Sequence, residues 1–159
     1  MKIQNDFKIL IKTQIYNKMV NCVNKASPNE ACGLVFGEIK EVEENGDFQY
    51  HYLPKKFNCI ESSRKSTVAF LMNNIEELNA LFYEAFSKYN LRLISIFHSH
   101  PGGNYPSGVD VDNMKYLDNC GNKAFKNQIW TIMDATNNEI NGFIYFNNEL
   151  VQIDVRLEN

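Results

Sequence analysis

The order of hydrophobic and polar residues predicts a strand and a helix at the start of the chain, followed by a second strand. Residues 7–11 form a short apolar run that is typical of a strand. Residues 13–26 carry apolar side chains at spacings of three and four, which predicts an amphipathic helix with Thr13 as its N-cap. A second apolar run over residues 31–36, closed by Gly37, predicts a short buried strand.

Turn residues organise the next part of the chain. The Asn45-Gly46 pair lies between charged residues and predicts a hairpin that leads into a strand over residues 49–53. Residues 57–66 are polar and irregular, which is typical of a loop, and residues 68–72 favour a further strand.

A second helix is expected to begin after Asn73 or Asn74, either of which can act as its N-cap, and to reach about Tyr89. Its apolar side chains recur at helical spacing and predict one buried stripe. The stripe comprises Ile75, Leu78, Leu81, Phe82, Ala85 and Phe86.

The remainder of the chain is dominated by strands, with one further helix. That helix is expected to begin near residues 107–110 and to turn Met114 and Leu117 toward the core. Strands are predicted over residues 91–97, 128–133, 142–146 and 150–155. Helices and strands therefore alternate early and strands dominate late. This order favours an α/β fold with a mixed β-sheet packed by helices, in a three-layer or wrapped arrangement.

Size and composition fit one globular domain. The chain has 159 residues, of which 44% are hydrophobic and 22% are charged. These values are close to those of an average globular protein. We therefore expect residues 1–159 to form a single domain.

Charge and hydropathy argue against two classes of partner. Sixteen basic and nineteen acidic residues give a net charge of -3, and no Lys/Arg cluster is longer than Lys55-Lys56, so we expect no binding to nucleic acid. No apolar stretch approaches the roughly 18 residues of a membrane-spanning helix, and the charged N-terminal segment does not resemble a signal peptide. We expect no membrane association and a cytoplasmic location.

The four cysteines are scattered along the chain and contain no CxxC pair, which argues against a cysteine-rich zinc site and against a redox motif. In a reducing compartment we expect buried thiols rather than disulfides. The cysteines are Cys22, Cys32, Cys59 and Cys120.

Two of the three histidines, His98 and His100, directly follow the apolar run over residues 91–97. Alternate side chains of a strand point to the same face, so the two imidazoles are expected side by side at the end of the strand. The same pair also fits two ordinary strand-end residues at a surface. The third histidine, His51, is expected to be a partly exposed strand residue.

Asp110 is a candidate third ligand, because the glycine and proline residues of the intervening loop allow the chain to reverse. Two imidazoles and one carboxylate suit zinc with an open fourth position, which is the arrangement of catalytic zinc and implies hydrolysis. The same three groups also form the facial triad of iron-dependent oxygenases.

Hydrolysis requires a proton acceptor for the attacking water, and Glu30 is the best candidate. It lies between the first helix and the strand over residues 31–36, a junction that can bring a carboxylate to the end of another strand. An ordinary acidic residue at a helix end is the alternative interpretation.

Taken together, these segments resemble the JAMM (MPN-plus) metalloprotease family over nearly the whole chain. The resemblance rests on Glu30 within Pro-Asn-Glu-Ala-Cys-Gly, on His-Ser-His-Pro at residues 98–101, and on Ser-Gly-Val-Asp at residues 107–110. It implies an MPN-like fold and zinc-dependent cleavage of the amide bond at the C-terminal tail of ubiquitin or a ubiquitin-like protein. The Ser-Gly-Val-Asp segment is similar to that of the proteasome-lid deubiquitinase.

The resemblance assigns a role to each candidate residue. It implies that His98, His100 and Asp110 bind Zn²⁺, that Glu30 is the general acid/base, and that Ser107 stabilises the oxyanion of the tetrahedral intermediate. For Ser107 the alternative is a helix N-cap, and we expect it to serve in one of these roles and not in both.

One departure from the family pattern concerns the loop between Pro101 and Ser107, which has five residues where the family usually has six. The usual spacing would place Gly108 and Val111 at the serine and aspartate positions, and neither side chain can perform the chemistry. A loop shortened by one residue is therefore the better alignment.

The size of the chain favours an archaeal or bacterial type of enzyme that acts on a single ubiquitin-like tail, because 159 residues leave no room for large insertions. Trimming of the C-terminus of a sulfur-carrier protein is an alternative reaction. A non-catalytic scaffold is the alternative without an activity. A proteasome-type or other assembly is a further possible partner.

Overall fold

The computed structural model describes residues 1, 3–60, 75–121 and 123–159. The elements in chain order are β1 (Ile3–Lys12), α1 (Thr13–Ala26), β2 (Cys32–Glu44), β3 (Asp47–Ile60), α3 (Ile75–Tyr89), β4 (Arg92–His100), α4 (Gly108–Asn119), the short 3-10 helix η1 (Lys123–Phe125), β5 (Ile129–Asp134), β6 (Ile140–Phe146) and β7 (Glu149–Glu158). The expected strand over residues 68–72 and the expected cap at Asn73 or Asn74 lie outside the described residues. None of the helices in the described part of the chain is long and apolar enough to cross a membrane.

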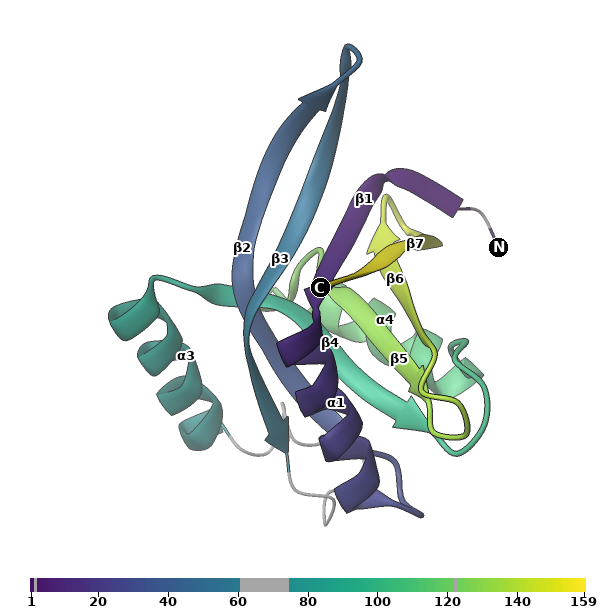
Figure 1. The fold of residues 1–159 in the computed structure, drawn as a ribbon. Coiled ribbons are helices and arrows are strands. Elements are labelled where there is room, and N and C mark those ends of the chain that lie inside the picture. The colour runs from purple at the N-terminus through teal and green to yellow at the C-terminus, as the bar shows by residue number, and fades with distance from the viewer. Residues whose placement is uncertain (2, 61–74, 122) are drawn as a thin grey trace.

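The strands form one mixed sheet that closes on itself in the order β1-β3-β2-β4-β5-β6-β7 (Figure 1). β1 pairs in parallel with both β3 and β7, and β4 pairs in parallel with β5. The remaining neighbours are antiparallel. The mixed sheet packed by helices is confirmed. Its closure through β1 was not predicted, because hydrophobic periodicity does not show which strands pair.

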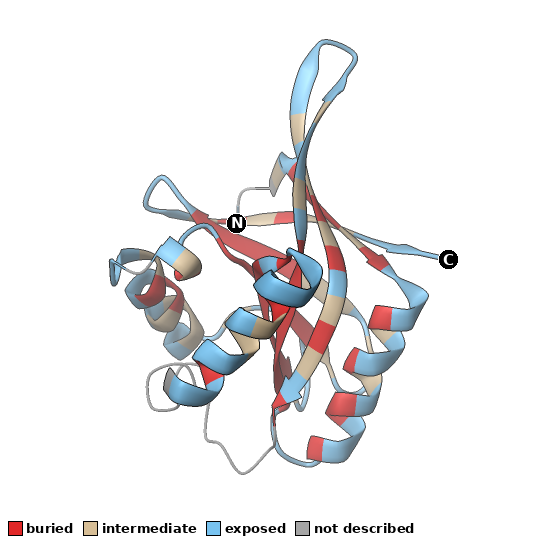
Figure 2. Ribbon diagram, turned by 90° about the vertical axis from the view of Figure 1, so that its left-hand side faces the viewer, coloured by how far each residue is buried: buried red, intermediate tan, exposed pale blue. Residues whose placement is uncertain are grey.

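Central strands are buried on both faces, which explains their nearly continuous apolar sequences. In β4, Ile94 and Phe97 belong to the core cluster that contains the buried side chains of α1. Leu93 and Ile96 belong to a second cluster, which contains buried residues of α3 and α4. Figure 2 shows the buried residues concentrated along the strands and on the inner faces of the helices.

The hairpin formed by β2 and β3 is confirmed at the Asn45-Gly46 turn, where both residues have positive φ, 53° and 84°. The prediction that the first of these strands ends at Gly37 is wrong. β2 passes through a bulge between Phe36 and Gly37 and continues to Glu44. The pairing with β3 requires glycine there, because a Cβ at Gly37 would lie 2.1 Å from the carbonyl oxygen of Leu53. The paired strands extend beyond the other elements (Figure 1).

The predicted loop over residues 57–66 is wrong in its described part, since β3 continues to Ile60. Phe57 and Ile60 are buried, and the Phe57 ring meets the Phe97 ring edge-on with 5.4 Å between centroids. Pairing with β2 and packing against β4 stabilise this strand although its sequence is partly polar. Such long-range contacts do not leave a local signal.

Details of two helices also differ from the expectations. Lys12 is the N-cap residue of α1, while the Thr13 hydroxyl donates a hydrogen bond of 3.0 Å to the carbonyl oxygen of Glu158. In α3, Leu78 and Ala85 are buried as predicted, but Phe86 is 68% exposed. Phe86 lies beyond the edge of the buried stripe.

Cys22 of α1 and Cys59 of β3 form a disulfide, which corrects the expectation that all four cysteines are thiols. The two residues are 37 positions apart in the sequence. They meet because α1 packs against β3, an arrangement that cysteine spacing cannot reveal. Cys120 is an exposed thiol.

Candidate metal centre and its surroundings

The end of β4 carries His98 and His100 on the same face, as the two-residue period of a strand requires. Their rings lie 4.9 Å apart between centroids. The His98 ring also lies edge-on against the buried ring of Trp130 on β5, at 6.4 Å. Neighbouring strands and the aromatic ring therefore restrict the orientation of the first imidazole.

The first turn of α4 supplies Asp110. Ser107 is the N-cap of this helix, and its hydroxyl accepts a hydrogen bond of 3.1 Å from the Asp110 amide. In return the Ser107 amide donates a hydrogen bond of 2.8 Å to Oδ2 of Asp110. This reciprocal capping box orients the carboxylate toward the end of β4.

Three side-chain atoms converge between β4 and α4. Nε2 of His98 lies 3.2 Å from Nε2 of His100, and Oδ2 of Asp110 lies 3.3 Å from the former and 3.0 Å from the latter. Ligand atoms around a tetrahedral zinc with bonds of about 2.0 to 2.1 Å would be about 3.3 Å apart. The donor set and its spacing therefore fit zinc.

Asp110 is held in its ionised form. Burial favours the neutral carboxyl, but hydrogen bonds to Oδ2 and the attraction of His98 outweigh it and hold the pKa of Asp110 well below its usual range. The hydrogen bonds come from His98 and from Ser107. A carboxylate that stays charged at neutral pH is suited to bind a cation.

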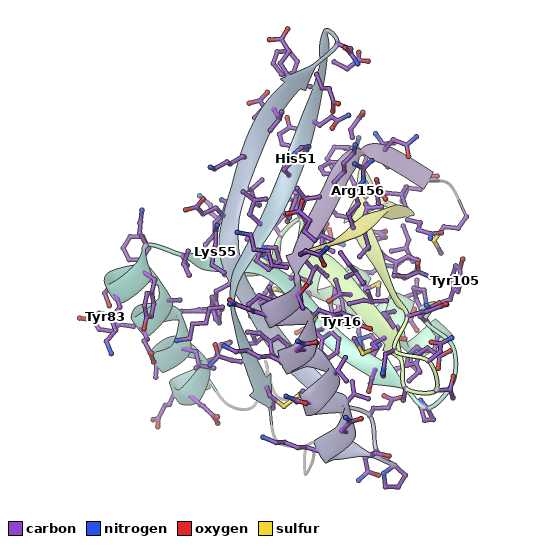
Figure 3. All side chains as sticks on the ribbon, in the orientation of Figure 1. Tyr16, His51, Lys55, Tyr83, Tyr105 and Arg156 are labelled. Carbon is purple, nitrogen blue, oxygen red and sulfur yellow. A yellow bond between two sulfur atoms is a disulfide. The ribbon has the colours of Figure 1, made fainter. Side chains whose placement is uncertain are left out.

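Asp110, and not Val111, converges with His98 and His100, as the alignment with a loop shortened by one residue requires. Asn104 anchors this loop to the start of β6. Its side-chain Nδ2 donates to the carbonyl of Glu139, and its Oδ1 accepts from the side-chain Nδ2 of Asn141. Tyr105, labelled in Figure 3, packs its ring 5.7 Å from that of Phe143. These contacts hold the shortened loop against β6.

Glu30 lies at the same end of the sheet. β2 and β4 are antiparallel with Cys32 opposite His98, and Ala31 bonds to Ser99. Glu30 directly precedes Ala31 in the chain, and His100 directly follows Ser99. Glu30 is exposed, and its side chain is free of the core. The fold thus brings the predicted proton acceptor to the end of β4 that bears the histidines.

Ser99 is the residue that the sequence reasoning missed. It is 1% exposed, its hydroxyl accepts a hydrogen bond of 2.8 Å from the Ala31 amide, and its own amide donates one of 3.0 Å to the Ala31 carbonyl. These bonds fasten the residue next to Glu30 to the strand between the two histidines. The place of Ser99 between the two histidines, on the opposite face of the strand, was the available signal.

The capping role of Ser107 is compatible with the oxyanion role. As a cap, the hydroxyl uses one of its oxygen lone pairs, and its hydrogen remains available for donation. The expectation that the two roles exclude each other is therefore too strict. The oxyanion role itself stays a prediction.

His51 is remote from this centre. It lies on β3, is partly exposed as expected, and its Nε2 is 3.1 Å from Oε1 of Gln49. Figure 3 shows His51 on the extended hairpin. It takes no part in the site.

The amino-acid sequence matches the family of prokaryotic homologs of the JAB domain over residues 12–146. The chain belongs to this family. The finding confirms the JAMM-type resemblance, and the JAB domain spans all of the elements that form the site.

Individual relatives agree with this assignment. The chain is 34% identical to a desampylase of Pyrococcus furiosus over 110 residues, which are 69% of each protein. A solution structure of a Desulfitobacterium hafniense protein matches with a TM-score of 0.67 and 18% identity, covering 95% of this chain and 93% of that one. The second comparison supports the fold.

Proposed function

We propose that this JAB-domain protein is a zinc-dependent isopeptidase or peptidase that hydrolyses the amide bond at the C-terminal tail of a ubiquitin-like protein. The observation that carries the proposal is the convergence of His98, His100 and Asp110 within 3.0 to 3.3 Å. Similarity to a desampylase supports a ubiquitin-like modifier as the substrate.

His98, His100 and Asp110 would hold the ion. Bound zinc would acidify the attacking water and polarise the scissile carbonyl. The Glu30 carboxylate accepts the proton of that water and later delivers it to the leaving amine, so that water and the amide become an acid and an amine. The Ser107 hydroxyl donates to the oxygen on which negative charge develops.

Glu30 is exposed and forms no ion pair with a described residue, so its carboxylate is available to accept and release a proton. In an iron-dependent oxygenase neither Glu30 nor Ser107 would have a function. The presence of Glu30 and Ser107 in the chain therefore supports the proposal of hydrolysis over oxygenation.

The test is cleavage of a ubiquitin-like protein that carries an isopeptide-linked lysine at its C-terminus. We expect Glu30→Gln to retain zinc and lose turnover by about a hundredfold or more, because it removes the general base. Glu43→Gln, on the exposed hairpin, is the matched control and should keep full activity. Normal turnover by Glu30→Gln would exclude Glu30 as the base.

Metal analysis of the same samples separates the alternatives. His98→Ala and Asp110→Ala should lose both zinc and activity, since either change removes a ligand. Bound iron with oxygen consumption would instead establish an oxygenase. Zinc binding without cleavage of any carrier tail, together with capture of a large assembly, would favour a scaffold. Participation in a proteasome-type assembly and a cytoplasmic location stay predictions.

A further inference from the structure

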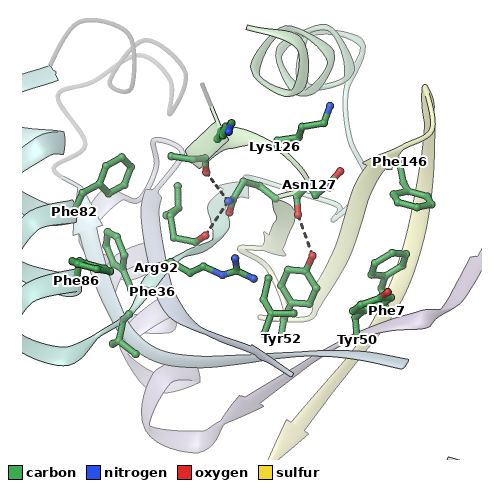
Figure 4. Close-up of a pocket in the computed structure, with 16 residues that line it drawn as sticks. Phe7, Phe36, Tyr50, Tyr52, Phe82, Phe86, Arg92, Lys126, Asn127 and Phe146 are labelled. Carbon is green, nitrogen blue, oxygen red and sulfur yellow. Dashed lines mark hydrogen bonds between the residues drawn. The ribbon is translucent and has the colours of Figure 1, made fainter. Parts of the chain in front are cut away.

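A cavity of about 530 Å³ lies at the end of the barrel remote from the candidate metal centre (Figure 4). Leu91, Arg92 and Leu93, at the start of β4, contribute to its lining. The histidines lie at the other end of the same strand. Six residues of strand separate Arg92 from His98, which corresponds to about 20 Å. The cavity is therefore a second site.

Aromatic side chains form two of its walls. Figure 4 shows Phe36, Phe82 and Phe86 on one side and Phe7, Tyr50 and Phe146 on the other. Phe7 stacks on Tyr50 at 5.4 Å and meets Phe146 edge-on at 5.3 Å. These aromatic walls suit a flat, aromatic guest, since ring pairs at such distances are stabilising.

The charged residues of the lining are all cationic. Arg92, Lys123 and Lys126 contribute to it, and the described lining contains no acidic residue, although the whole chain has a net charge of -3. Lys126 lies 3.8 Å from Asp118. Arg92 makes no ion pair with a described residue, and Figure 4 shows its guanidinium directed into the cavity. The site is thus complementary to an anion.

We propose that this cavity binds a small aromatic organic anion. The rings lie between the aromatic walls, and the anionic group lies at Arg92 and Lys123. The proposal stands on a different part of the molecule from the proposed hydrolase and does not depend on it.

Anilinonaphthalene sulfonate, which joins aromatic rings to a sulfonate, is the probe. We expect saturable binding at one site, measured by fluorescence titration, and about tenfold weaker binding to Arg92→Ala, which is the effect of losing one charged hydrogen bond. Arg156→Ala, which removes an exposed arginine of β7, is the matched control and should bind as wild type. Uncharged phenylnaphthylamine should not distinguish these two variants.

A second pair of variants tests the aromatic wall without disturbing the core. Phe86→Ala should weaken binding of the probe, whereas Tyr83→Ala should not, because Tyr83 is 75% exposed on the same helix and does not line the cavity.

Equal affinity of Arg92→Ala and Arg156→Ala for the sulfonate, or binding that does not saturate, would overturn the proposal. His98→Ala should bind the probe normally. If His98→Ala lost isopeptidase activity but bound the probe normally, the result would bear on the proposed hydrolase and leave the proposed ligand cavity unaffected.

Discussion

At the scale of single residues, Ser99 connects the two halves of the candidate site. Its hydroxyl and its amide both bond to Ala31, so the segment that carries Glu30 is fixed relative to His98 and His100. Neither bond involves the proposed ligands themselves. A change at Ser99 should therefore act on the position of the base more than on the binding of metal.

We predict that Ser99→Ala lowers kcat by about tenfold while the bound zinc per chain stays normal, because the buried Ala31 amide loses its acceptor. Ser99→Thr, which keeps the hydroxyl, should restore most of the rate. Cleavage kinetics and metal analysis of the three proteins provide the measurement. If Ser99→Ala and Ser99→Thr lost activity equally, packing rather than the hydrogen bond would explain the effect.

Tyr52 provides a second prediction at this scale, on stability at high pH. Its hydroxyl donates a hydrogen bond of 3.1 Å to the carbonyl of Asn127, and burial raises the pKa of Tyr52 to about 12 from 10.0. Because the folded pKa is the higher one, this contribution is fully present below pH 10 and is lost as the pH rises to about 12.

The free energy of unfolding should therefore fall by up to about 2 to 3 kcal/mol over that interval through Tyr52 alone. Tyr52→Phe should be less stable at neutral pH and should lose this part of the pH dependence. Denaturant unfolding of both proteins between about pH 8 and about pH 12 measures this difference in pH dependence. Parallel pH profiles for the two proteins would contradict the assignment.

At the scale of elements, α4 links helix capping to Asp110, a candidate metal ligand. The hydrogen bonds that begin the helix are the same ones that orient Asp110. The first turn of a helix also favours a negative charge, which helps to keep this carboxylate ionised. The hydrogen bonds that cap the helix therefore also orient the Asp110 carboxylate.

Ser107→Ala should lower the free energy of unfolding by about 1 kcal/mol, because it removes the cap. Ser107→Asp should restore that stability, since aspartate is an equally good cap. If Ser107 also stabilises the oxyanion, kcat should stay low in the aspartate variant, because an ionised carboxylate has no proton to donate. Recovery of both stability and turnover in Ser107→Asp would show that Ser107 acts only as a cap.

At the scale of the whole molecule, the Cys22–Cys59 disulfide joins α1 to the end of β3. The link holds together two elements that flank the candidate site, since β2 pairs with β3 and bears the segment next to Glu30. Closing a loop of 37 residues in the unfolded chain corresponds to a stabilisation of about 4 kcal/mol in the chain-entropy description.

We predict a loss of about 3 to 4 kcal/mol in unfolding free energy for the double variant Cys22→Ala and Cys59→Ala, within the usual range for native disulfides. Cys120→Ala, at an exposed thiol, should be close to neutral. Chemical denaturation with and without reductant gives the measurement. Insensitivity of the wild type to reductant would show that the bond contributes little to stability.

Much of the fold followed from local patterns. The helices α1 and α4 were predicted from apolar spacing, β4 from its apolar run, and the hairpin from Asn45-Gly46. Errors occurred where partners distant in sequence decide the conformation. Residues 57–60 became a strand through pairing with β2, and Thr13 bonds to Glu158 instead of capping α1.

By itself, the sequence determined which chemical groups are available and in what order. His98 and His100 share a face because strands have a period of two, and the position of Asp110 in the first helical turn was evident from the serine three residues before it. These are consequences of local backbone geometry, which neighbouring residues dictate.

Only the tertiary structure decided how those groups meet. Closure of the sheet through β1, the bonding of Ala31 to Ser99, the contact of Cys22 with Cys59, and the aromatic cavity all join residues that are remote along the chain. Their common cause is the packing of both faces of the sheet. Such packing depends on the complementary shapes of whole elements and therefore cannot be derived from any one segment.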